Sequence, residues 1–132
     1  MACLDECAGM SIGLDVACAD FKYRDLFKTE QYVGIDLERE NLNKGLAFRA
    51  HAGDVGILAD LLRLENTPDI ADLLVSTHTI ASLPSVDRVR GVQALANAVR
   101  PNGTLFVNLP TEDDTAELES FLREQFGEVG RT

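Results

Sequence analysis

The chain has 132 residues, of which 45% are hydrophobic and 26% charged, and this predicts a single globular domain over residues 1–132. Its 22 acidic and 12 basic residues give a formal net charge of −10, which repels a phosphate backbone and argues against nucleic acid as a partner. No apolar run has the length of a membrane span, and residues 1–11 lack the basic residues of a targeting peptide. We therefore expect a cytoplasmic protein without membrane contact.

Three cysteines are present, Cys3, Cys7 and Cys18, and their odd number argues against a disulfide framework. With only His51 and His78 as further ligands of the kind zinc prefers, no metal site is expected. Cys18 lies among small residues and is best interpreted as a compact apolar filler.

Strand-like and helix-like segments alternate in the first half of the chain. The expected elements are a strand over Ile12–Val16, a helical turn over 22–27, a strand over 32–35, a polar helix over 38–44 ended by Gly45, a weak strand over 47–50, and an amphipathic helix marked by Val55, Leu58, Leu61 and Leu62.

The second half continues the alternation after a break at 66–69. The expected elements are a strand over 70–75, a helix capped by Ser85 with Val89, Val92, Ala96 and Val99 on its core face, a turn at 101–103, a strand over 104–107, and a helix from Asp114 with Leu118, Phe121, Leu122 and Phe126 on its apolar face. This order predicts an α/β fold, a three-layer α-β-α sandwich with a mostly parallel sheet, truncated after the fifth or sixth strand.

Two segments are the most informative for function. The strand over Ile12–Val16 leads into a turn of small residues, and the strand over 32–35 ends on Asp36. Ligands of open parallel sheets bind beyond the carboxyl ends of the strands, where a carboxylate can accept hydrogen bonds from a ribose diol. The pair therefore points to a ligand that contains a nucleoside.

These segments resemble the Rossmann-like class I methyltransferases that use S-adenosylmethionine, over about residues 11–126. Residues 14–20 are similar to the first motif of that family, 33–36 to the second and 53–55 to the third. The stretches 72–84 and 95–107, with their Arg-Pro-Asn-Gly turn, are similar to its fourth strand, following helix and fifth strand.

The resemblance implies S-adenosylmethionine as cofactor and a small molecule as methyl acceptor. The implied cofactor-binding residues are Asp15, Ala17, Cys18, Ala19, Asp36, Leu37, Asp54, Val55 and Ser76. Asp36 would hold the ribose and Asp54 the adenine amino group, while Ser76, Thr77 and His78 would line the acceptor side. His78 is the one candidate catalytic group, as a base or an orienting residue.

The chain departs from the family in its first turn. Ala17, Ala19 and Phe21 stand where members have glycine, which permits positive φ and close backbone approach. The methyl group of Ala19 and the ring of Phe21 are expected to narrow the site, unless the ring turns into the core.

Each candidate residue also has a structural interpretation. Asp36 and Asp54 could each be a helix N-cap, Asp15 could bind groups of its own turn, and His78 could be a loop residue bonded to backbone. Two functions follow from these alternatives. One is methyl transfer to a small molecule, and the other is an inactive methyltransferase-like module that pairs, as a homodimer or with another chain, through an exposed sheet edge at 104–108. A nucleotide-binding oxidoreductase is a weaker third hypothesis, because the Gly-x-Gly fingerprint is absent.

Overall fold

The computed structural model describes residues 11–77, 80 and 83–107. Five parallel strands form one sheet in the order β3-β2-β1-β4-β5. The strands are β1 (Ile12–Val16), β2 (Gln31–Asp36), β3 (Val55–Leu58), β4 (Ala71–Ser76) and β5 (Val99–Val107). The predicted α/β class and parallel sheet are confirmed, whereas the expected helix from Asp114 lies outside the described residues.

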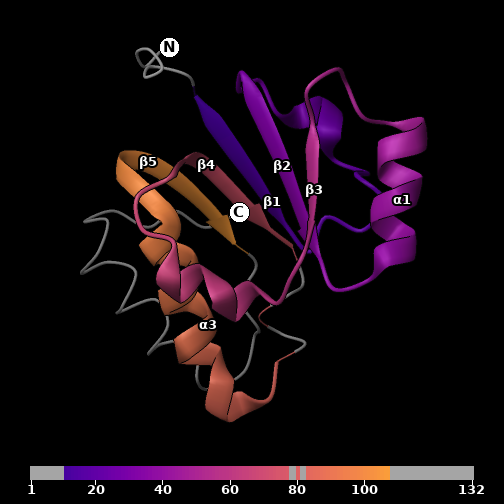
Figure 1. Ribbon diagram of the computed structural model, residues 1–132. Helices are drawn as coiled ribbons and strands as arrows, with labels where there is room; N and C mark the ends of the chain where they lie inside the picture. Colours follow the sequence, from indigo (N-terminus) through magenta and orange to yellow (C-terminus); the bar gives the residue numbers. More distant parts are fainter. Residues whose placement is uncertain (1–10, 78–79, 81–82, 108–132) are drawn as a thin grey trace.

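Helical segments cover both faces of the sheet (Figure 1). Helix α1 (Arg39–Phe48) and the 3₁₀ turn η1 (Arg24–Leu26) lie on one face, and the 3₁₀ helix η2 (Leu61–Asn66) packs with α3 (Ser85–Ala98) on the other. Two hydrophobic clusters correspond to these layers. The larger one joins Leu14, Val16 and Leu74 to η2 and α3, and the smaller one holds Cys18, Phe21, Phe27, Tyr32 and Leu42.

Three expectations for the first half are wrong. Residues 55–58 form edge strand β3 rather than a helix, because they pair with 33–36 of β2. The helix that was expected to end at Gly45 continues to Phe48, so the weak strand over 47–50 does not form. The helical turn expected over 22–27 is present as the 3₁₀ turn η1.

The second half agrees better with expectation. Strand β4 and helix α3 form where the pattern places them, although Pro84 and not Ser85 is the N-cap residue. Val92 is fully buried as predicted, and Leu95 and Ala98 are buried with it, whereas Val99 is already the first residue of β5. The predicted turn at 101–103 lies inside β5, where a register shift opposite Ala71–Leu73 accommodates Asn102 at a φ of 70°.

Gly45 lies inside α1, where its missing side chain makes room for an aromatic ring. A Cβ atom built on Gly45 would lie 2.5 Å from Cδ1 of Phe21, and one on Gly34 would lie 2.6 Å from Cε1 of the same ring. The ring of Phe21 is fully buried and packs edge-on against Tyr32, with ring centroids 5.0 Å apart. Gly34 and Gly45 thus form the two walls of a slot for Phe21.

Gly45→Ala is expected to destabilise the protein by about 1–3 kcal/mol, although alanine normally favours a helix, because the added methyl overpacks the slot. The free energy of unfolding in urea measures this loss. Gly56→Ala is the matched control, since its Cβ would lie 3.4 Å from the flexible side chain of Leu46. A Gly45→Ala variant more stable than the wild type would contradict the slot.

Candidate functional site

The carboxyl ends of the strands bring most of the predicted cofactor residues together. Val16, the last residue of β1, lies beside Ile35 of β2 and Ser76 of β4, and Asp36 lies beside Leu58 of β3. The turn after β1 continues from this edge. Asp15, Ala17, Cys18, Ala19, Asp36, Leu37 and Ser76 therefore lie at one edge of the sheet, as predicted.

The turn after β1 has the backbone of a glycine-rich loop without its glycines. Ala17, Ala19 and Phe21 have φ values of 63°, 50° and 65°. These are the three positions at which the sequence departs from the family, and each left-handed residue costs on the order of 1–2 kcal/mol. The amides of Ala17 and Cys18 both donate to the carbonyl of Ile35, at 2.7 and 3.1 Å. The turn is thus folded over the end of β2.

The ring of Phe21 does not narrow the site, because it occupies the slot between Gly34 and Gly45 in the core. The alternative that the ring turns inward is the one the structure adopts. The methyl group of Ala19, which a glycine would lack, remains at the carboxyl end of the sheet.

Asp36 connects the turn to the end of β2. Its Oδ2 accepts a hydrogen bond of 2.8 Å from the amide of Ala19, and its Oδ1 accepts one of 2.9 Å from the amide of Glu38. A carboxylate offers roughly four lone-pair positions, so capacity for further donors remains. Asp36 is not the N-cap of α1, which is Glu38. Leu37, 69% exposed, presents an apolar surface beside this carboxylate.

Asp15 is a buried acid on the face of the sheet that carries the smaller cluster. Its Oδ2 accepts a hydrogen bond of 2.7 Å from the hydroxyl of Tyr32, and the residue is 2% exposed. Burial raises the pKa of Asp15 from 3.8 to about 6; the Tyr32 hydrogen bond opposes this shift and the charge of Asp36 adds to it. Burial also raises the pKa of Tyr32 and of the Cys18 thiol. Asp15 therefore titrates closer to neutrality than an ordinary aspartate.

Ser76 ends β4 with a fully buried side chain. Its hydroxyl oxygen is the one buried side-chain polar atom of the described residues that has no hydrogen-bond partner. The next candidate, His78, lies outside the described residues.

Asp54 and Val55 lie at the amino end of β3, opposite the end that carries Asp36. Arg24 donates to both carboxylate oxygens of Asp54, and the two side chains are only 8% and 4% exposed. The guanidinium of Arg24 also lies 4.8 Å from the centroid of the Tyr32 ring. The structure does not bring Asp54 or Val55 to the predicted site, because 55–58 form a strand and carry the chain across the sheet.

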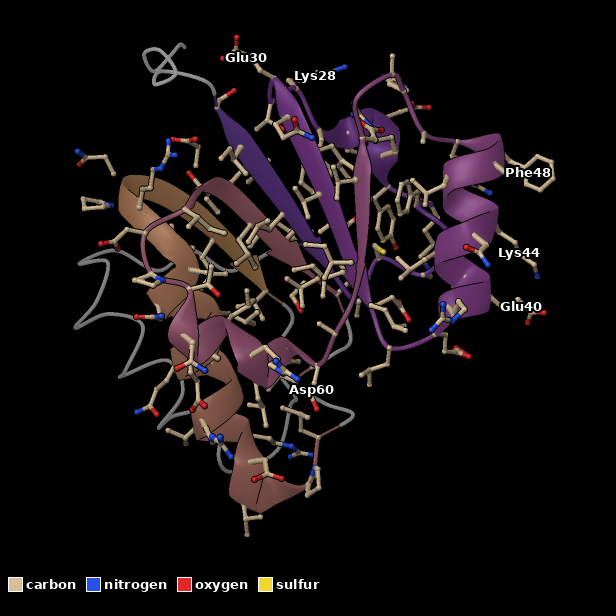
Figure 2. All side chains as sticks on the ribbon, viewed as in Figure 1. Lys28, Glu30, Glu40, Lys44, Phe48 and Asp60 are labelled. Atoms are coloured by element: carbon tan, nitrogen blue, oxygen red, sulfur yellow. The ribbon has the colours of Figure 1, made fainter. Side chains whose placement is uncertain are left out.

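Asp60, and not Asp54, is the acid at the carboxyl end of β3, where it is the N-cap residue of η2. It follows β3, and Figure 2 shows it at the end of the sheet opposite Lys28 and Glu30. The amide of Leu62 donates to its carboxylate at 2.9 Å, and the amide of Ala59 donates to the carbonyl of Asp36 at 3.0 Å. The signal in the sequence was the short apolar run 55–58 between two acids, which fits a four-residue strand as well as a helix turn.

An apolar pocket of about 360 Å³ lies on the same face of the sheet as Asp15. Val75, which lines it, is the register partner of Asp15. Within the described part of the chain, the lining contains no charged residue and consists of Tyr23, Leu26, Phe27, Leu73, Val75, Thr77 and Phe106. Such a pocket suits a small uncharged molecule; the sequence did not predict it.

Comparison with solved structures shows the fold. A methyltransferase of Mesorhizobium loti that depends on S-adenosylmethionine superposes with a TM-score of 0.63 at 22% identity, over 74% of this chain and 45% of that one. The N-methyltransferase NodS of Bradyrhizobium japonicum, in complex with S-adenosylhomocysteine, gives 0.64 at 16% identity, over 74% and 52%. YcgJ of Bacillus subtilis gives 0.67 at 14% identity, over 87% and 50%.

The chain thus has the Rossmann-like fold of S-adenosylmethionine-dependent methyltransferases, and it spans about half the length of these three proteins. No family model and no curated protein matches it. Among residues 11–77, 80 and 83–107, no helix is long and apolar enough to cross a membrane, and no group of three metal-ligating side chains occurs.

Asp54→Ala is expected to destabilise the protein by about 3–5 kcal/mol, because Arg24 would keep a buried charge without a partner. Affinity for a ligand at the carboxyl edge should not change. Glu65→Ala is the control, since it removes an equally bidentate but exposed pair with Arg90, which solvent screens, and its loss should be much the smaller of the two. Equal losses of unfolding free energy would contradict the assignment of Asp54 to the fold.

Asp15→Asn is expected to stabilise the protein at pH 7.5 relative to pH 4.5, by up to on the order of 2 kcal/mol. The folded state binds the Asp15 proton more tightly than the unfolded chain, so its stability falls as pH rises from 3.8 through about 6. Asparagine keeps an acceptor for Tyr32 and does not ionise. Urea unfolding at the two pH values measures the difference, and an equal effect at both would contradict it.

Proposed function

We propose that the chain carries the cofactor-binding half of an S-adenosylmethionine-dependent methyltransferase that acts on a small-molecule acceptor. The observation that carries the proposal is the hydrogen bond from the turn amide of Ala19 to the carboxylate of Asp36. It joins a left-handed turn after the first strand to an acid at the end of the second. This is the pair of elements from which an adenosyl site is built in such a sheet.

The residues at the carboxyl edge fit this cofactor. Asp36 has acceptor capacity left for the two ribose hydroxyls, and exposed Leu37 offers an apolar contact for the adenine ring. Asp60 replaces Asp54 as the acid for the adenine amino group. Asp15 supplies a negative charge for the cationic end of the cofactor, next to the backbone of Ala17, Cys18 and Ala19.

When bound, S-adenosylmethionine supplies an electrophilic methyl group on a sulfonium. The chain then has to hold the two reactants in line and exclude water, which is catalysis by proximity and requires no acid–base pair. We also propose that His78 orients the methyl acceptor. The apolar pocket beside Val75 supports a small, uncharged acceptor, and the net charge of −10 argues against nucleic acid.

A second candidate is an inactive binding module. It is favoured by the turn itself, because the amides of Ala17, Cys18 and Ala19 are already engaged within the chain. Such a module would pair as a homodimer, or with another chain, through the β5 edge, where Phe106 is 52% exposed.

Calorimetric titration with S-adenosylhomocysteine separates the two candidates. For the methyltransferase we expect a Kd in the micromolar range that weakens at least tenfold in Asp36→Asn, because the diol loses a charged acceptor worth about 1.5–3 kcal/mol. Glu65→Gln, which removes only the exposed pair with Arg90, is the control and should bind as the wild type does. No heat at millimolar ligand would refute the cofactor site and favour the binding module.

A further inference from the structure

A single side chain donates to the Asp15 carboxyl. Among the described residues that donor is the hydroxyl of Tyr32, at 2.7 Å, and it occupies one of the two oxygens. Within residues 11–77, 80 and 83–107, neither the backbone of the turn nor a basic side chain bonds the other oxygen. A carboxyl that is 2% exposed and so sparsely bonded is stable either when it carries a proton or when a cation lies beside it.

The groups around Asp15 add negative charge rather than compensate it. From β2, Tyr32 bonds the carboxyl and Asp36 lies close enough to raise its pKa; from the turn, the Cys18 thiol faces it as a neutral group. β4 presents apolar Leu73 and Val75 on this face, and α1 presents Leu42. The guanidinium of Arg24 lies over the Tyr32 ring and is neutralised by Asp54.

We propose that the Asp15–Tyr32 pair exchanges a proton for the positive charge of the ligand, so that the site selects cationic nucleosides and binds them in a proton-linked manner. The inference rests on the proposed function. In the ligand-free protein below about pH 6, Asp15 holds a proton on the oxygen that Tyr32 does not bond. When the ammonium or sulfonium group arrives, the O–H bond breaks, the proton passes to solvent, and the carboxylate keeps the electron pair. One positive charge replaces another, and no redox partner is needed.

The exchange has a defined pH dependence. Because the free acid titrates at about 6, a cationic ligand should bind about tenfold more weakly at pH 5 than at pH 7, and its binding should release close to one proton at pH 5. The α-amino group of the ligand stays charged throughout this range, since it titrates at about 7.7–8.0. Adenosine, which carries no positive charge here, should bind with the same affinity at both pH values.

The test is calorimetric titration of the whole chain with S-adenosylmethionine, S-adenosylhomocysteine and adenosine at pH 5, 6 and 7. Each titration is run in two buffers of different ionisation enthalpy, which counts the protons released. Linkage with both charged ligands assigns the exchange to the ammonium group, and linkage with S-adenosylmethionine alone assigns it to the sulfonium; either supports the proposal. A charged ligand that binds equally at pH 5 and 7 without proton release overturns it.

Two variants separate exchange from a merely structural role of the pair. Asp15→Asn should abolish the proton release and reduce the ratio of affinities at pH 7 and pH 5 to below twofold. Tyr32→Phe keeps the ring packing but removes the hydrogen bond that lowers the pKa of Asp15, so the midpoint of the linkage should move to higher pH. An unchanged midpoint in Tyr32→Phe, or an unchanged pH ratio in Asp15→Asn, overturns the proposal.

Should Asp15→Asn not fold, the wild-type proton count and the Tyr32→Phe shift decide alone. Failure of all three nucleosides to bind at any pH refutes the proposed function and the exchange with it. Binding without linkage refutes the exchange and leaves the proposed function in place.

Discussion

The site depends on the burial of one aromatic ring. Phe21 ends a turn in which every second residue has a positive φ, a conformation that costs free energy at each non-glycine position. Full burial of the ring between Gly34 and Gly45 offsets that cost. Because the ring is held in the core, the preceding backbone must run across the end of β2, and this puts the amide of Ala19 on Asp36. Glycine is therefore found not in the turn but at positions 34 and 45, against which the ring of Phe21 packs.

This packing explains how the turn keeps its left-handed backbone although it contains Ala17, Ala19 and Phe21 in place of glycines. Glycine permits the turn to fold without support from its surroundings, whereas alanine and phenylalanine require tertiary packing to impose the same backbone. Tyr32 contacts both the turn and the buried acid, since its ring packs against Phe21 and its hydroxyl donates to Asp15. The smaller cluster therefore both supports the backbone of the turn and influences the pKa of Asp15.

The fold class, the parallel sheet and the strand-to-turn unit could be predicted from the sequence, because apolar runs separated by small or polar residues are local signals. The end of α1 could not be predicted. Glycine is typical of a helix end, but Gly45 lies inside α1, where it leaves room for the ring of Phe21. The third strand could not be predicted either, because the four residues 55–58 are too few to distinguish the period of a strand from that of a helix. Because of that error, Asp54 was placed at the carboxyl end of the sheet, whereas the acid that lies there is Asp60. The charge state of Asp15 required coordinates, because Tyr32 reaches it from a different strand.

The Arg24–Asp54 ion pair has a consequence for how such a protein can change. It ties residues 30 positions apart at the amino end of the sheet, away from the loops at the carboxyl edge. This ion pair and the candidate site therefore lie at opposite ends of the same strands. Substitutions in the loops at the carboxyl ends leave the ion pair in place, so sequence can diverge there while this contribution to folding is retained.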